Sequence, residues 1–96
     1  MSSYFIAQIK INNEDTYKKY LKDASLIFSK YNGKYLAVDN DPEILEGKWN
    51  YTRIVLIEFP NKNELKKWYN SKDYQKILKY RLNAAQCDTI IANSKS

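Results

Sequence analysis

Hydrophobic and polar residues alternate in four short segments of the chain and recur at three- and four-residue spacing in two longer ones. The four alternating segments are Tyr4–Ile11, Lys34–Val38, Thr52–Phe59 and Asp88–Asn93. Alternation at every second position is the pattern of a strand with one buried and one open side. The chain is therefore predicted to form four strands, of which Thr52–Phe59 carries the strongest signal.

The two longer segments are predicted helices with recognisable first turns. Asn13 stands where a helix cap is needed, and Gly33 is expected to supply the left-handed residue that ends this first helix. Asn61 caps the second helix, with Glu64 three residues later. Ser71 is a further cap residue within the second segment, so we expect that helix to break and restart there.

The predicted order is β-α-β-β-α-β, which is the α+β ferredoxin-like motif. Residues 1–96 then form a single domain, a four-stranded antiparallel sheet with two helices on one face. The other face carries Ile54, Leu56 and Ile6, an apolar patch of the kind that marks an interface. We therefore expect a homodimer in which the open sheet faces of two copies pack together.

RNA-recognition modules share this strand order, which allows a direct comparison. Their third strand carries aromatic residues that stack on bases, whereas the corresponding positions here are Ile54 and Leu56. The net charge of +5 comes mainly from lysines. Lys72, Lys76 and Lys79 share one helix side and are predicted to be a solvated face. Nucleic acid is thus a disfavoured partner, and weak polyanion binding through this face stays open as an alternative.

The composition removes several classes of site. The chain has no histidine and one cysteine, Cys87, so the commonest metal ligand, the commonest general base and an internal disulfide are all missing. We expect no metal and no cofactor, and Cys87 is predicted to pack without a chemical role. The sequence also lacks a long apolar run and a signal-peptide pattern. The simplest expectation is a cytoplasmic protein without a membrane segment.

Two charged residues of the strongest strand are candidates for function. By alternation Arg53 points towards the helices, where it either pairs with a buried acid or binds a ligand. Glu58 shares the open face with Ile54 and Leu56. Partial burial in a dimer would raise its pKa and suit it to proton transfer as a catalytic group. The alternative for Glu58 is a hydrogen bond or ion pair across the dimer.

The second helical segment supplies three more candidates for ligand binding. Trp68 is either a core anchor or part of a pocket, and the hydroxyl of Tyr74 is placed to line one. Arg81 follows Tyr74 by seven residues, so both can share a helix face. Its guanidinium can grip a carboxylate or a phosphate, or it can hold an acid of the same subunit.

Several blocks of the sequence resemble a known family. They are Tyr35–Ala37, Leu45–Trp49, Arg53–Val55, Glu58–Pro60, Trp68–Ser71 and Tyr74–Gln75, followed by Arg81. In this order they are similar to domain-of-unknown-function family thirteen-thirty, over about Tyr4 to Ala92. The chain departs from that pattern at Val38–Asn40, where Arg-Gly-Gly is expected, and at Lys72, where proline is expected.

The resemblance implies a dimeric α+β barrel, the superfamily to which this family belongs. That superfamily includes cofactor-free monooxygenases, haem-degrading and isomerase-like enzymes, and ligand-sensing domains. We therefore expect a homodimer that binds a small, anionic organic molecule and that acts as a metal-free enzyme of the monooxygenase or isomerase type. The alternative is a non-enzymatic binding or regulatory module.

Overall fold

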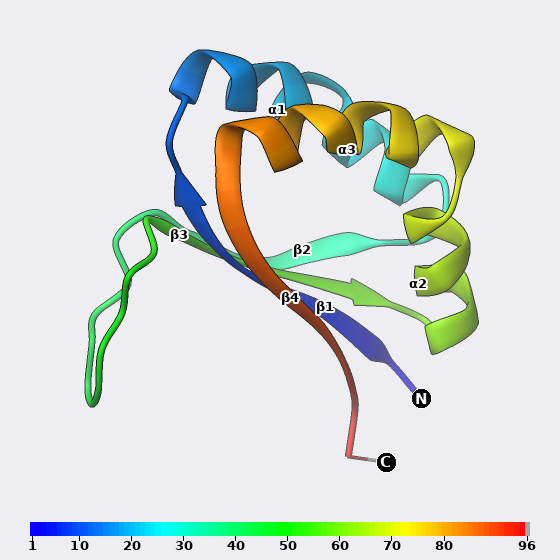
Figure 1. Ribbon diagram of the computed structural model, residues 1–96. Coiled ribbons are helices and arrows are strands. Elements are labelled where there is room, and N and C mark those ends of the chain that lie inside the picture. The colour runs from blue at the N-terminus through cyan, green and yellow to red at the C-terminus, as the bar shows by residue number, and fades with distance from the viewer. Residues whose placement is uncertain (96) are drawn as a thin grey trace.

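A computed structural model of the chain describes residues 1–95. Strands and helices follow the predicted order (Figure 1). The elements are β1 (Ser3–Ile11), α1 (Glu14–Ser29), β2 (Lys34–Asp39), β3 (Arg53–Phe59), α2 (Lys62–Tyr69), α3 (Lys72–Ala84) and β4 (Ala85–Asn93). The sheet has the strand order β2-β3-β1-β4, and every neighbouring pair is antiparallel. The predicted ferredoxin-like fold is confirmed.

The two faces of the sheet differ as the alternation predicts. The helices lie over one face only (Figure 1). On that face the side chains of β1 and β3 are buried, Phe5 and Val55 among them. Ile6 and Leu56 are directly paired across the two strands and stay half-buried on the open face. Ile90 of the edge strand β4 pairs with Ile6 and is exposed, so it extends the apolar patch of the open face.

The end of α1 differs from the prediction. The left-handed residue is Asn32, with φ 63°, and not Gly33. The glycine is needed for space, because a Cβ at Gly33 would lie 2.7 Å from the Phe59 ring. The Gly33 N–H donates to the Phe28 carbonyl at 3.0 Å, which holds the chain close to that ring as it enters β2. A close approach of backbone to a buried ring leaves no signal in the local sequence.

The second helical segment is split where Ser71 predicted. The Ser71 hydroxyl accepts a hydrogen bond from the Tyr74 N–H, as a helix cap does. The cap makes α2 and α3 two helices, both on the covered side of the sheet (Figure 1).

The last strand begins three residues earlier than predicted, at Ala85, so Cys87 lies inside β4. The carbonyl of Ala84 accepts from the N–H groups of Asn12 and Asn13. This pairing lets α3 pass into β4 without the glycine or proline that would have marked the boundary.

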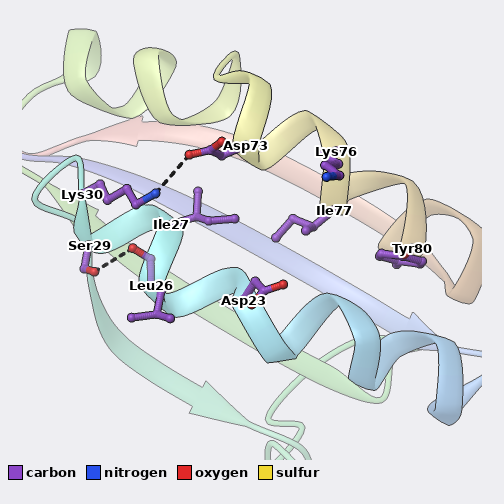
Figure 2. A pocket seen from close by; sticks show the side chains of 9 residues that line it. All are labelled: Asp23, Leu26, Ile27, Ser29, Lys30, Asp73, Lys76, Ile77 and Tyr80. Atoms are coloured by element: carbon purple, nitrogen blue, oxygen red, sulfur yellow. Dashed lines mark hydrogen bonds and ion pairs between the residues drawn. The ribbon is translucent and has the colours of Figure 1, made fainter.

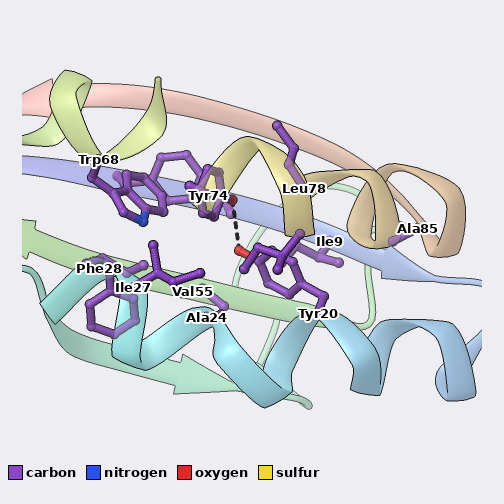
Figure 3. Close-up of a cluster of buried hydrophobic side chains, with 14 of the residues drawn as sticks. Ile9, Tyr20, Ala24, Ile27, Phe28, Val55, Trp68, Tyr74, Leu78 and Ala85 are labelled. Atoms are coloured by element: carbon purple, nitrogen blue, oxygen red, sulfur yellow. Dashed lines mark hydrogen bonds between the residues drawn. The ribbon is translucent and has the colours of Figure 1, made fainter. Parts of the chain in front are cut away.

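Trp68 is the centre of the core and has no exposed surface. Its ring centroid lies 4.2 Å from that of Tyr74, 5.0 Å from Phe5 and 5.1 Å from Phe59. These rings come from α2, α3, β1 and β3, and Figure 3 shows Trp68 and Tyr74 side by side above the sheet. Trp68 therefore joins both layers of the fold.

Residues 40–52 form an irregular arm between β2 and β3. The arm projects from one end of the sheet, away from the helices (Figure 1). It exposes Leu45 at 87% and carries a left-handed turn at Gly47, φ 83°.

Within the described residues, no helix is both long enough and apolar enough to cross a membrane.

Candidate functional site

The two arginines of the chain are buried in the same layer, between the sheet and the helices. Arg53 begins β3 and points to the covered face, where it is 8% exposed. Arg81 lies in the last turn of α3 and is 2% exposed. Every lysine, by contrast, is exposed. Because arginine stays charged even when buried, this layer holds two positive charges.

Tyrosine rings from α1 lie beside both guanidiniums. The Arg53 Cζ is 5.7 Å from the Tyr17 ring centroid, and the Arg81 Cζ is 5.8 Å from the Tyr20 ring centroid. The two rings are themselves 5.6 Å apart. The electron-rich ring faces attract the cations, so α1 holds the two arginines against a shared aromatic wall.

Part of the hydrogen-bonding capacity of these cations is unused within residues 1–95. Arg53 donates through Nη1 to the Asn40 Oδ1, at 3.0 Å. The Nε of Arg53, and the Nε and Nη1 of Arg81, are buried without a partner. Among residues 1–95, no carboxylate lies within ion-pair distance of either arginine. A buried charge without a counter-charge is strongly unfavourable, and two such cations side by side attract negatively charged groups.

A small cavity lies beside both guanidiniums. Its volume is about 10 Å³, which is room for roughly one water molecule. The lining comes from the sheet, α1 and α3. It comprises Phe5, Ala7, Ile9, Tyr17, Tyr20, Leu21, Phe28, Tyr35, Arg53, Val55, Ile57 and Arg81. A ligand larger than water must therefore displace a group that now occupies the site.

The phenols around the cavity are hydrogen-bond donors at neutral pH. Burial raises the pKa of Tyr17 to about 12, although Arg53 and Arg81 oppose the shift. Burial also raises the pKa of Tyr20, whose hydroxyl is hydrogen-bonded to the Tyr74 hydroxyl at 2.8 Å (Figure 3). Burial alone lowers the pKa of Arg81, but the Tyr74 and Tyr20 phenols and the Cys87 thiol more than reverse this. The site thus combines cations and neutral donors.

The raised pKa of Tyr17 predicts a loss of stability at alkaline pH. The unfolded phenol ionises with its ordinary pKa of 10.0, and the folded one at about 12. The stabilisation is therefore complete below pH 10 and is lost as pH rises through 12. For Tyr17→Phe, the free energy of unfolding measured by urea denaturation should fall less steeply between pH 9 and 12 than for the wild type, by up to about 1.4 kcal/mol per pH unit. Tyr80→Phe removes a hydroxyl from an exposed ring as the control, and equal slopes for wild type and Tyr17→Phe would contradict the prediction.

The structure separates Glu58 from the two arginines. Glu58 lies on the open face, as predicted, and its Oε1 is 3.3 Å from the Lys34 Nζ. Arg53 and Arg81 lie on the covered face. Within one subunit Glu58 cannot move a proton for a ligand held by these arginines. Proton transfer and anion binding, which were expected to act together, would therefore occur on opposite faces of the sheet.

Trp68 and Tyr74 stand behind the cavity and do not line it. Trp68 packs within the core, and its Nε1 has no hydrogen-bond partner. Tyr74 is fully buried; its hydroxyl is hydrogen-bonded to that of Tyr20 and also interacts with Arg81. Of the five candidates predicted from the sequence, the structure brings Arg53 and Arg81 together at the cavity, and Tyr74 interacts with Arg81 without lining the cavity.

Three residues of the site were not among the predicted candidates: Tyr17, Tyr20 and Asn40. The tyrosines were expected on the buried face of α1, and nothing in that pattern distinguishes a ring beside a cation from an ordinary core ring. Asn40 belongs to the segment in which the sequence departs from the family pattern. That departure was the one available signal.

A larger hollow of about 650 Å³ lies on the outer surface between α1 and α3 (Figure 2). Its charged side chains are exposed, and Lys30 pairs with Asp73 at 3.1 Å. Leu26 and Tyr80 are exposed at its edge. Since its charges are paired or solvated, this hollow lacks the unsatisfied groups that distinguish the arginine pocket.

Residues 1–95 contain no group of three or more histidine, cysteine, aspartate or glutamate side chains placed to hold a metal ion.

Solved structures with the same fold include proteins of known and unknown function. A protein of unknown function from Rhodopseudomonas palustris has a TM-score of 0.82 and 15% identity, with 99% of this chain and 83% of that chain covered. SnoaB, a cofactor-independent oxygenase from Streptomyces nogalater, has a TM-score of 0.73 and 4% identity, with coverage of 99% and 94%. A dimeric ferredoxin-like protein of unknown function from Thermobifida fusca has a TM-score of 0.71 and 14% identity, with coverage of 98% and 92%. At such identities the similarity establishes the fold alone.

Comparison of sequences gives a family. The sequence model described as Domain of unknown function (DUF1330) matches residues 2–94, which confirms the resemblance drawn from the sequence blocks. No curated protein matches the sequence.

Proposed function

Because the chain belongs to the family described as Domain of unknown function (DUF1330), whose description assigns no activity, we propose a function from its own geometry: it binds a small organic anion between Arg53 and Arg81. One observation carries the proposal. Two buried guanidiniums have unsatisfied N–H groups and no carboxylate partner among the described residues. Charge-assisted hydrogen bonds to an anion would satisfy both the charge and the donors.

Binding is favoured over chemistry that begins with proton abstraction. The residues that line the cavity include no carboxylate and no histidine. The tyrosine phenols are protonated at neutral pH because burial raises the pKa of Tyr17, Tyr20 and Tyr35. The pocket therefore suits a molecule that arrives already ionised.

A metal-free enzyme of the monooxygenase or isomerase type is the second candidate function. The shared fold with a cofactor-independent oxygenase favours it, and two arginines can stabilise negative charge that develops on a bound substrate. Any general base would have to come from outside the lining of this pocket. Glu58 is a candidate base only for a site on the open face.

We propose that a second copy of the chain covers the open face. Ile6, Ile54, Leu56 and Ile90 form an apolar patch there, and similar folds include a protein described as dimeric. Leu56→Glu would place a charge at the centre of this patch. It is expected to give a folded monomer, because an unpaired charge cannot be buried between two sheets without a large cost.

Sedimentation velocity is the measurement for this prediction. Leu26→Glu is the matched control, since Leu26 is 67% exposed on the helical side of the fold. The wild type and Leu26→Glu should sediment as dimers and Leu56→Glu as a monomer. A monomeric wild type, or a dimeric Leu56→Glu variant, would rule out this interface.

The anion-binding proposal is tested by thermal unfolding of the wild type in acetate and in benzoate, with chloride used to keep the ionic strength constant. A bound anion raises the melting temperature with its concentration, and at 100 times Kd the gain is about 2.7 kcal/mol. We expect a saturable rise for a carboxylate over chloride. Identical melting temperatures in all three salts would contradict the proposal.

A further inference from the structure

A neutral side chain, that of Asn40, accepts the side-chain hydrogen bond that Arg53 donates. The Asn40 Oδ1 accepts from the Arg53 Nη1 at 3.0 Å. Aspartates stand on both sides of it, but the Asp39 Oδ1 accepts instead from the Asp41 N–H, at 2.8 Å. The buried cation is therefore met by an amide, although a carboxylate is available at each neighbouring position.

The Asn40 carboxamide has the shape of a carboxylate. Both groups are planar, and each carries two polar atoms on one carbon. A carboxylate has a second acceptor and a full negative charge, and its hydrogen bonds to a guanidinium are roughly twice as strong as neutral ones. An incoming carboxylate can thus use the space of the amide and bind Arg53 more strongly than the amide does.

The amide is also the group best placed to move. The cavity of about 10 Å³ cannot take an organic ligand as it stands. The residues that line it belong to β1, β2, β3, α1 and α3, whose backbones are fixed by regular hydrogen bonds, whereas Asn40 contacts the site through Arg53 alone. Asn40 is exposed and begins the irregular arm of residues 40–52, so it can swing out without breaking a helix or a strand.

On the basis of the anion-binding function proposed above, we infer that the ligand is a carboxylate and that its head group replaces the Asn40 carboxamide on Arg53. Asn40 holds the site in the unliganded protein. Arg81, with two unpartnered N–H groups, binds a second acceptor atom of the same ligand. The flat tyrosine walls of Tyr17 and Tyr20 accommodate the remainder of the molecule.

Asn40→Asp tests the inference by building the carboxylate into the protein. The variant is expected to melt at a higher temperature than the wild type and to lose the acetate-dependent rise, because its own carboxylate now pairs with Arg53. Asn50→Asp makes the same charge change on the same arm, at an exposed residue that does not hydrogen-bond to Arg53. That control should keep the wild-type response to acetate. An Asn40→Asp variant that responds to acetate as the wild type does would overturn the inference.

Asn40→Ala gives an independent test in which no charge is added. Removing the competing amide should tighten acetate binding by about tenfold, the usual worth of a hydrogen bond to a charged group. An unchanged acetate Kd would overturn the role of Asn40 while leaving the pocket intact. Absence of any acetate effect on both the wild type and Asn40→Ala would remove the anion site itself. Phosphate stabilising the wild type more than acetate at equal ionic strength would overturn the carboxylate class.

Discussion

The Arg81→Met variant is expected to be more stable than the wild type without ligand, and to gain nothing from acetate. Arg81 is 2% exposed, and two of its N–H groups have no partner. Methionine keeps most of the side-chain volume and removes the buried charge. Replacement of buried ion pairs by apolar side chains is neutral or stabilises a protein by about 1–4 kcal/mol, and we expect a gain in that range for a buried charge that has no counter-charge. For a domain of this size each kcal/mol raises the melting temperature by about 4–8 °C.

Thermal unfolding with and without acetate measures both effects. Lys79→Met is the matched control, because it removes a positive charge from an exposed position of the same helix. It should leave both the stability and the acetate response near the wild-type values. A loss of stability in Arg81→Met without ligand would show that Arg81 is a structural residue, and it would contradict the proposal that Arg81 is part of an anion-binding site.

Trp68→Ala is expected to remove most of the free energy of unfolding of this domain. Trp68 is fully buried and contacts rings from both layers of the fold. Truncation of a buried tryptophan costs about 3–5 kcal/mol, and a domain of this size has a total stability near the low end of about 5–15 kcal/mol. Circular dichroism during urea denaturation gives the fraction folded.

Trp68→Phe separates packing from the indole N–H. The Trp68 Nε1 is buried without a partner, so its removal costs no hydrogen bond, and a phenyl ring keeps part of the aromatic contact. This variant should stay folded and be only moderately less stable than the wild type. If Trp68→Ala were to unfold at the same urea concentration as Trp68→Phe, Trp68 would not be the anchor of the core.

The fold could be predicted because it depends on local sequence patterns, namely hydrophobic alternation and helix caps. Alternation in β1 and β3 decides which side chains face the helices, and it correctly assigns Arg53 and Glu58 to opposite faces of the sheet. Ser71 predicted the break between α2 and α3 because a cap residue satisfies the free N–H groups of a helix start. These features depend on neighbours in the chain.

The site depends on contacts between distant segments, and the sequence indicates these poorly. Tyr17, Arg53 and Arg81 come from α1, β3 and α3, and their spacing carries no shared motif. Asn40 meets Arg53 because β2 and β3 pair as far as Asp39 and Ile54, the neighbours of these two residues. Gly33 was predicted to be a left-handed residue, whereas the structure needs a glycine there for space beside the Phe59 ring. The sequence gives no sign of this because Phe59 lies 26 positions later in the chain. Residue type was the useful guide, since both arginines are buried while the lysines stay exposed.

Nuclear magnetic resonance of the arginine side chains tests the anion pocket most directly. The chain has two arginines, so a ¹H–¹⁵N spectrum of the Nε–H groups contains two signals, from Arg53 and Arg81, and Arg81→Met assigns them. During an acetate titration at constant ionic strength, we expect both signals to move along one saturable curve with a single Kd. Signals that do not move, or that drift linearly without saturation, would contradict the claim that these two buried arginines hold an anion.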